Sequence, residues 1–185
     1  MVKVIGILGP MGSGKTTAAK YIQNKFGYTL ITMGDLVRKL AAAEGLPPTR
    51  ENLQKIQKIY TSKYGDTYFI NEVIHEIREK KLEKAIIDGM RRVCDVTVPL
   101  EEFKNNILLI LIDADPKIRF ERIKKRGRPG APKTFEEFKK QEKKEFELFN
   151  FEKSFSYAHV TIENNSDLDD FYRRVEETLK RYNFT

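Results

Sequence analysis

Eight residues near the start of the chain constrain its fold more than any other stretch. They read Gly9-Pro10-Met11-Gly12-Ser13-Gly14-Lys15-Thr16 and fit the pattern G-x-x-x-x-G-K-[ST]. An apolar, β-branched run at 4–8 precedes them and predicts a buried strand, and residues 17–22 are helix formers without a breaker. A glycine-rich loop between a strand and a helix directs its backbone N–H groups at one anion, so the motif is interpreted as a phosphate-binding P-loop.

The pattern also assigns roles within the loop. Lys15 is predicted to reach the β- and γ-phosphates of ATP, and the Thr16 hydroxyl to ligate Mg²⁺. ATP and Mg²⁺ are therefore the predicted cofactors. The predicted nucleotide-binding residues are Gly9, Gly12, Ser13, Gly14, Lys15, Thr16 and Thr17.

Length and composition indicate one globular domain spanning residues 1–185. Hydrophobic residues make up 40% of the chain and charged residues 33%. The longest aliphatic run, 107–112, is too short to span a bilayer. Met1 leads directly into the first predicted strand, so we expect no signal peptide, and the single cysteine, Cys94, cannot form an internal disulfide. These features predict a cytoplasmic location and no membrane partner.

The net charge of +7 is concentrated in one segment. Residues 117–144 contain twelve Lys or Arg and four Glu, a local charge of +8. A basic patch of this kind suits nucleic acid, an acidic membrane or a polyphosphate ligand. Its position after the fourth predicted strand, beside a P-loop, favours the polyphosphate.

The hydrophobic pattern predicts strands that alternate with helices. The predicted strands are 3–8, 28–32, 85–88, 107–113 and 158–163. Such alternation implies a parallel sheet with right-handed crossovers, in which ligands bind at the carboxyl ends of the strands. This rule gathers the P-loop, Asp35, Asp88, Asp113 and Asp115 at one edge of the sheet. The fold class is therefore α/β: a three-layer P-loop NTPase fold with a five-stranded parallel sheet of expected order 2-3-1-4-5.

Two short stretches resemble motifs of adenylate kinase and other nucleoside monophosphate kinases. Residues 34–38, Gly-Asp-Leu-Val-Arg, resemble the family's G-D-x-x-R stretch. The resemblance implies that Arg38, beside Asp35, holds the phosphate of the acceptor. From the residues alone, the alternative is that Asp35 only interacts favourably with the positive N-terminus of a helix.

Residues 88–92, Asp-Gly-Met-Arg-Arg, resemble the family's D-G-[FI]-P-R stretch. The resemblance implies that Asp88 acts with Mg²⁺ through water and that an arginine grips acceptor phosphate. Arg91 stands where the pattern has proline, so Arg91 and Arg92 remain alternatives. Related archaeal adenylate-kinase-like proteins have D-G-[IV]-R, which favours Arg91. A buried strand-end carboxylate without a metal is the alternative for Asp88.

The same resemblance implies a helical acceptor-binding region at 35–81 and a mobile lid at about 126–140. Arg119, Arg122 and Arg126 recur at about one helical turn and are expected to share a face, with Arg128 in the Gly/Pro-rich loop behind them. The resemblance implies that such arginines neutralise the transferring phosphoryl group, and Arg122 and Arg126 are favoured. A solvated basic helix is the alternative. Lys139, Lys140 and Lys143 lie where the family has a further arginine, and Asn164 and Asn165 where it places the adenine.

These expectations converge on ATP-dependent phosphoryl transfer to a nucleoside monophosphate. Lys15, Asp88, Arg122 and Arg126 are the predicted catalytic residues, with Thr16 and Asp88 at the metal. The predicted substrate-binding residues are Asp35, Arg38, Arg91 and Arg92. One alternative is a dephospho-coenzyme A kinase-like enzyme, whose hydroxyl acceptor would use Asp35 as base. The other is an ATPase factor that binds RNA or a protein through the basic segment, although no RNP-like aromatic motif supports RNA.

Overall fold

A five-stranded parallel sheet forms the centre of the molecule. The computed structural model describes residues 2–127 and 130–185. Its strands lie in the order β2-β3-β1-β4-β5, and every neighbouring pair is parallel. The strands are β1 (Lys3–Leu8), β2 (Thr29–Thr32), β3 (Lys84–Asp88), β4 (Ile107–Asp113) and β5 (Val160–Glu163). The predicted fold class and strand order are confirmed.

Nine α-helices accompany the sheet in the described residues. They are α1 (Lys15–Phe26), α2 (Met33–Ala43), α3 (Arg50–Tyr64), α4 (Tyr68–Glu79), α5 (Val93–Phe103), α6 (Pro116–Arg126), α7 (Phe135–Phe149), α8 (Phe151–Phe155) and α9 (Leu168–Arg181). Helix α8 has no counterpart in the sequence analysis. It follows α7 after Asn150, whose left-handed φ of 50° turns the chain sharply.

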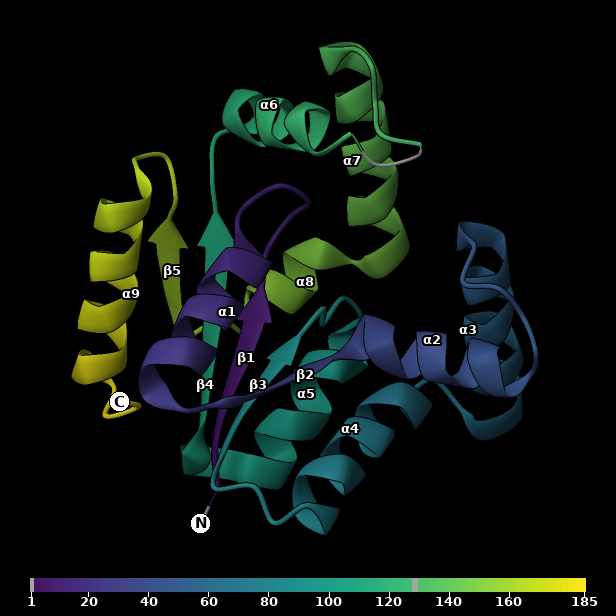
Figure 1. Ribbon diagram of the computed structural model, residues 1–185, viewed down its shortest axis with the longest axis horizontal. Helices are drawn as coiled ribbons and strands as arrows, with labels where there is room; N and C mark the ends of the chain where they lie inside the picture. Colours follow the sequence, from purple (N-terminus) through teal and green to yellow (C-terminus); the bar gives the residue numbers. More distant parts are fainter. Residues whose placement is uncertain (1, 128–129) are drawn as a thin grey trace.

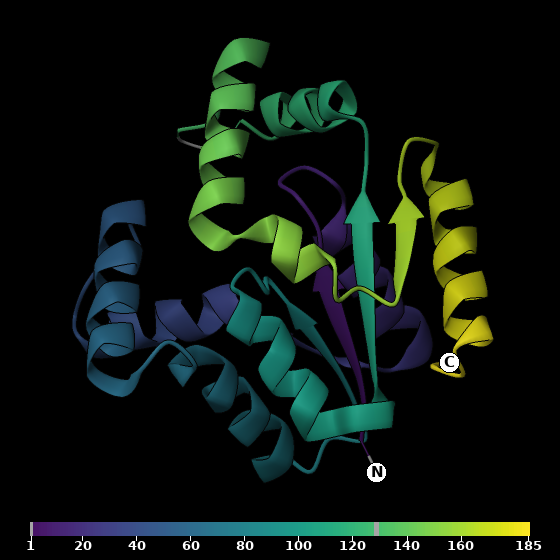
Figure 2. The ribbon, with the colours of Figure 1, turned by 180° about the vertical axis from the view of Figure 1, so that it is seen from behind.

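Both faces of the sheet are apolar because successive strand residues point to opposite sides. Val4 and Leu8 of β1 face a core with α2, α4 and α5, whereas Ile5 and Ile7 face a core with α1 and α9. Figure 1 shows α1 and α9 on one side of the sheet, and Figure 2 shows α5 and α8 on the other. The continuous apolar pattern of β4 therefore reflects burial on two sides.

Two helical arms stand at the carboxyl edge of the sheet (Figure 1). The α2–α3 arm projects sideways, and helices α6 and α7 rise above β1, β4 and β5. A separate small core of Phe120, Ile123 and Phe138 joins α6 to α7. The predicted lid falls here, and two of its residues, Arg128 and Pro129, lie outside the described residues. Within the described ranges, no helix has the length and apolarity needed to cross a membrane.

The core between α1 and α9 predicts a large penalty for truncating Phe171. This side chain is fully buried, so Phe171→Ala should lower the free energy of unfolding by about 3–5 kcal/mol. Urea denaturation measures the change. Leu148→Ala is the matched control, because Leu148 is 75% exposed and its loss should cost at most about 0.5 kcal/mol. A loss below about 1 kcal/mol for Phe171→Ala would contradict the assigned core.

Candidate active site

The P-loop follows β1 and is enclosed by three other segments. Gly9, Gly12 and Gly14 have φ values of 142°, 83° and 108°, which side chains rarely adopt. A Cβ at Gly9 would lie 2.1 Å from the Ile112 carbonyl oxygen, and one at Gly14 would lie 2.2 Å from Asn164 Nδ2. The glycines are therefore required both for the curl of the loop and for the close approach of its neighbours.

Lys15 begins α1 and folds back over the loop. Its Nζ donates to the carbonyl oxygens of Gly9 and Pro10, each at 2.7 Å. Burial lowers the pKa of Lys15 to about 8, and the nearby charge of Asp88 opposes this shift. Among the described residues it makes no ion pair within 4.0 Å. A cation held only by carbonyl dipoles above a glycine cradle fits the polyphosphate that the sequence predicted.

The two predicted metal-site residues lie in direct contact. The Thr16 hydroxyl donates to Asp88 Oδ2 at 3.2 Å. Asp88 ends β3, directly beside Ile7 of β1, and is 5% exposed. Burial raises the pKa of Asp88, while the charge of Lys15 and the Thr16 hydrogen bond counteract that shift. A hydroxyl and a carboxylate at a phosphate cradle are the protein ligand types that Mg²⁺ accepts alongside phosphate and water.

The structure separates the two neighbouring arginines that the sequence left as alternatives. The Arg91 guanidinium lies over the Phe149 ring at 5.3 Å, and its Nη1 is 3.8 Å from a Glu145 carboxylate oxygen. The charge of Arg91 also lowers the pKa values of Lys15 and Asp88, so Arg91 lies near the P-loop. Arg92 points elsewhere, with Nη1 2.7 Å from Asp66 Oδ1 between α3 and α4.

Asp95 fixes this turn, and sequence reasoning missed it. Its buried carboxylate accepts hydrogen bonds from the backbone N–H groups of Arg91 at 2.9 Å and Arg92 at 2.8 Å. Ser154 of α8 donates to the Arg91 carbonyl oxygen at 3.2 Å. The available signal was an acidic residue in the first turn of a helix, three positions after its N-cap.

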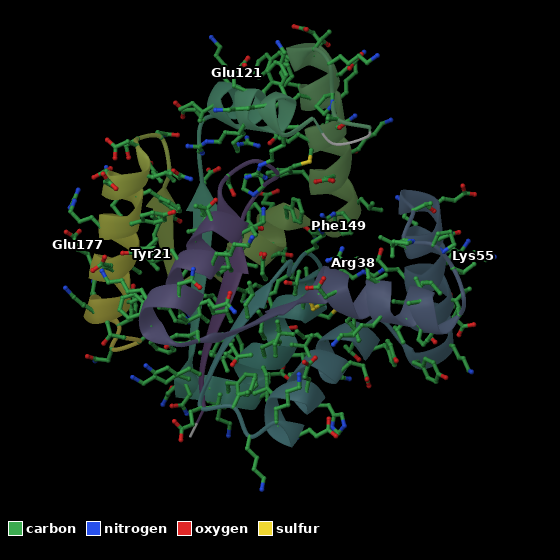
Figure 3. All side chains as sticks on the ribbon, viewed as in Figure 1. Tyr21, Arg38, Lys55, Glu121, Phe149 and Glu177 are labelled. Carbon is green, nitrogen blue, oxygen red and sulfur yellow. The ribbon has the colours of Figure 1, made fainter. Side chains whose placement is uncertain are left out.

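Asp35 and Arg38 lie together at the start of α2. Arg38 Nε donates to Asp35 Oδ1 at 3.1 Å, and both side chains are about half exposed. A Cβ built on Gly89 would lie 3.6 Å from Met33 Cβ, so the turn after Asp88 packs against the first residue of α2. Figure 3 shows Arg38 near the start of the α2–α3 arm and Phe149 at the foot of α7.

Arg122 and Arg126 line a cavity beside the P-loop. Arg122 Nη2 donates to Asn164 Oδ1 at 3.3 Å, whereas its buried Nη1 has no hydrogen-bond partner among the described residues. Burial and the charge of Arg126 lower the pKa of Arg122. The cavity has a volume of about 330 Å³. Its lining residues are Gly14, Thr17, Arg122, Lys125, Arg126, Asn164 and Leu168.

Asn164 joins this cavity to the loop. It is 3% exposed, and its Nδ2 donates to the Ser13 carbonyl oxygen at 2.8 Å. The same amide therefore orients Arg122 and secures the P-loop backbone. The contact of Asn164 with an adenine stays a prediction.

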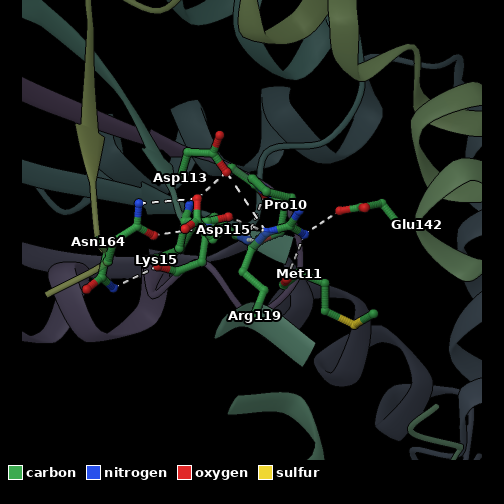
Figure 4. A network of polar contacts seen from close by, with 12 residues as sticks. Pro10, Met11, Lys15, Asp113, Asp115, Arg119, Glu142 and Asn164 are labelled. Atoms are coloured by element: carbon green, nitrogen blue, oxygen red, sulfur yellow. Dashed lines mark hydrogen bonds and ion pairs between the residues drawn. The ribbon is translucent and has the colours of Figure 1, made fainter. Parts of the chain in front are cut away.

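Arg119 corrects the expectation that three arginines share one face. It is 4% exposed and points between the P-loop and α7, away from the cavity that Arg122 and Arg126 line. Figure 4 shows its contacts with Met11 and Glu142. Helix geometry alone would bring Arg119 and Arg126 to similar sides of α6, so it is the contacts with Met11 and Glu142 that hold the Arg119 side chain inward. Arg128 lies outside the described residues.

Helix α7 turns its lysines away from the site. Lys139, Lys140 and Lys143 are exposed to solvent. The side of α7 that contacts the site carries Glu142 and Glu145, with Phe138 and Phe149 on the same stripe at helical spacing. The helix therefore presents carboxylates to Arg91 and Arg119, because burial of Phe138 turns the lysines outward.

The strand order, the glycine cradle and the Thr16–Asp88 contact together define a P-loop kinase fold. Shikimate kinase from Bacteroides thetaiotaomicron has a similar structure, with a TM-score of 0.64 and 18% identity over 96% of this chain and 98% of that one. Shikimate kinase from Acinetobacter baumannii, solved with shikimate, gives a TM-score of 0.62 and 15% identity over 100% and 97%. At these identities the likeness concerns the fold.

Sequence relatives identify the family. The profile of a family described as "AAA domain" matches residues 8–139. The UPF0200 protein of Pyrococcus horikoshii is 34% identical over 181 residues, 96% of each chain. The UPF0200/UPF0201 protein of Archaeoglobus fulgidus is 33% identical over 180 residues, and this chain spans 55% of its length. The chain belongs to the UPF0200 family, and the P-loop kinase fold that the sequence predicted is confirmed.

The lowered pKa of Lys15 predicts proton uptake when a polyphosphate binds. Without ligand, Lys15 loses its proton as the pH rises through about 8. An anion favours the charged form and raises the pKa again, so binding should take up about half a proton near pH 8 and almost none at pH 6.5. Calorimetry with Mg·AMPPNP in buffers of different ionisation enthalpy measures this uptake.

Lys15→Arg is the control for that measurement, because its guanidinium stays charged throughout this range. At pH 8 the Lys15→Arg protein should take up about half a proton less than the wild type, because Lys15 supplies that uptake in the wild type. Equal uptake by both proteins would show that Lys15 does not titrate at the phosphate site.

Proposed function

We propose that this protein is an ATP-dependent kinase that transfers the γ-phosphoryl group to a small phosphorylated acceptor, with nucleoside monophosphates as the first candidates. The position of Arg91 carries the proposal. This arginine leaves the turn after β3 and comes close enough to Lys15 and Asp88 to change the pKa of each. This closeness supports a role in which Arg91 would hold an acceptor phosphate beside a phosphoryl group bound at the P-loop.

The donor side is supported by the loop and the adjoining cavity. Lys15 would exchange its two carbonyl contacts for phosphate oxygens, and the N-terminus of α1 would add its positive dipole. Arg122, whose Nη1 has no hydrogen-bond partner in the described part of the chain, and Arg126 would contact the nucleotide in the 330 Å³ cavity. Mg²⁺, held through Thr16 and Asp88, would neutralise charge on the β- and γ-phosphates when bound.

The acceptor side combines Arg91 with the start of α2. Arg38 would release Asp35 to bind acceptor phosphate, since both side chains are accessible. We assign acceptor binding to residues 35–81 and closure over the site to the predicted lid at about 126–140, within a single domain. Closure would exclude water and limit wasteful hydrolysis. A small soluble substrate and a lone free cysteine are consistent with a cytoplasmic enzyme.

The first test measures ADP formation from Mg·ATP with a panel of acceptors: AMP, CMP, UMP, GMP, their deoxy forms and dephospho-coenzyme A. Rapid turnover with one monophosphate is expected. Lys15→Ala should reduce that rate by about 10²–10³-fold or more, because it removes a charged donor at the transferring group. Full activity of Lys15→Ala, or slow hydrolysis indifferent to every acceptor, would contradict the proposal. RNA-stimulated hydrolysis would instead favour an ATPase factor.

Arg91 and Arg92 provide a matched pair of neighbouring variants. Arg91→Met should lower kcat/KM for the acceptor by about 10–100-fold, because charged hydrogen bonds to phosphate contribute about 1.5–3 kcal/mol. Arg92→Met should change it by less than about threefold, since Arg92 pairs with Asp66 on the exposed surface. Steady-state kinetics at saturating ATP measures both. Equal losses, or a larger loss for Arg92→Met, would contradict the assignment.

One observation favours a hydroxyl acceptor as the second candidate. Glu145 is a partly buried carboxylate beside Arg91, and its charge raises the pKa of Lys15. A hydroxyl acceptor such as dephospho-coenzyme A needs a base, whereas a phosphate acceptor does not. Glu145 would serve as that base, in competition with Asp35, which already pairs with Arg38. Turnover only with dephospho-coenzyme A, lost in Glu145→Gln, would select this alternative.

A further inference from the structure

Arg119 occupies a position that neither the nucleotide cavity nor the acceptor arginines explain. It lies on α6, is 4% exposed, and its guanidinium contacts three separate segments (Figure 4). A buried guanidinium is costly unless its donors are satisfied and its charge is paired. The groups that satisfy the Arg119 guanidinium therefore show which segments of the chain this residue links.

One set of contacts ties Arg119 to the sheet and the P-loop. Its Nε donates to the Ala114 carbonyl oxygen at 2.7 Å, just after β4, and Asp113 Oδ1 lies 4.0 Å away. Its Nη1 donates to the Met11 carbonyl oxygen at 3.4 Å. The Arg119 backbone also abuts the loop, because a Cβ on Gly12 would lie 2.7 Å from its carbonyl oxygen.

The other set of contacts ties Arg119 to α7. Nη1 also forms an ion pair with the Glu142 carboxylate, and the guanidinium lies 5.4 Å from the centre of the Phe138 ring. Glu145 follows Glu142 by three residues and therefore lies on the same face of the helix. Glu145 is the residue that reaches Arg91. A polar path thus runs from the P-loop through Arg119 and α7 to the acceptor arginine.

The contact with Met11 is the adjustable link of this path. At 3.4 Å it is at the long end of hydrogen-bond distances, whereas the contact with Ala114 is short and anchored to the sheet. Lys15 donates to Pro10, the residue directly before Met11. When Lys15 turns to a bound phosphate, the Pro10–Met11 peptide loses that donor and can move toward Arg119.

We propose that Arg119 is a positioning residue that transmits occupancy of the P-loop to α7, and through α7 to Glu145, Phe149 and the acceptor arginine Arg91. Nucleotide binding tightens the Met11–Arg119–Glu142 link and orders α7 over the acceptor side. The inference rests on the proposed function in that the P-loop binds a nucleotide polyphosphate. It does not depend on which acceptor is used.

The experiment compares hydrogen exchange of α7 amides with and without Mg·AMPPNP. In the wild type, exchange across residues 138–149 should slow by about fivefold or more on binding, the lower end of typical coupling effects. Glu142→Gln keeps the side-chain shape but removes the charge of the ion pair. It should bind Mg·AMPPNP within about threefold of the wild type yet lose the response of α7.

Two further variants complete the design. Glu147→Gln is the matched control, because Glu147 lies on the same helix, is exposed and pairs only with Lys143 at 4.0 Å among the described residues. It should keep the full α7 response. Arg119→Lys retains the charge without the forked donors and should weaken the response. A thermal melt of each variant without nucleotide shows whether it is folded.

Two results would overturn the inference: wild-type α7 that does not respond although Mg·AMPPNP binds, or an undiminished response in Glu142→Gln. Failure of the wild type to bind Mg·AMPPNP would contradict the proposed function itself, and the coupling with it. Calorimetry of the same samples distinguishes these cases, because it reports binding independently of α7.

Discussion

The close enclosure of three P-loop glycines is the constraint on which the rest of the site depends. Backbone or side-chain atoms of Ile112, Arg119 and Asn164 occupy the space where a side chain at Gly9, Gly12 or Gly14 would begin. Strand β4, helix α6 and the segment after β5 therefore pack directly against the phosphate cradle. Arg122 comes from α6 and Asp88 from the end of β3. The conformation of the loop therefore also fixes where these two side chains lie.

Carboxylates offset much of the positive charge that gathers around this edge of the sheet. Arg38 pairs with Asp35, Arg91 with Glu145, and Arg119 with Glu142. Lys15 and Arg122 Nη1 are different, since Lys15 is held by carbonyl groups and Arg122 Nη1 has no partner in the described residues. The attraction for an anion is thus strongest at the P-loop and weaker at Arg38 and Arg91, each of which already pairs with a carboxylate.

The fold and the P-loop could be predicted because their signals are local. The apolar run at 4–8, the loop glycines and the apolar pattern of β4 each indicate their local structure and burial within a few residues. The orientation of α6 and α7 could not be read in the same way. Arg119 differs from expectation, and the lysines of α7 face solvent, because the small core of Phe120, Ile123 and Phe138 decides which side of each helix turns inward. Glu142 and Glu145 gain their roles only from Arg119 and Arg91, which are distant in sequence, whereas Asp95 binds backbone N–H groups only three and four residues before it.

The position of Asn164 bears on whether the N-terminal part of this protein can form the nucleotide site without the C-terminal part. The matching family profile ends at residue 139, and the recognisable motifs all lie before that point. Yet the amide that secures Ser13 and orients Arg122 comes from residue 164, after the last strand. The nucleotide site is therefore not a separable N-terminal module. The site is complete only after the C-terminal strand and helix have been synthesised. A nascent chain that already contains the whole P-loop motif therefore still lacks the Asn164 contacts that secure the loop.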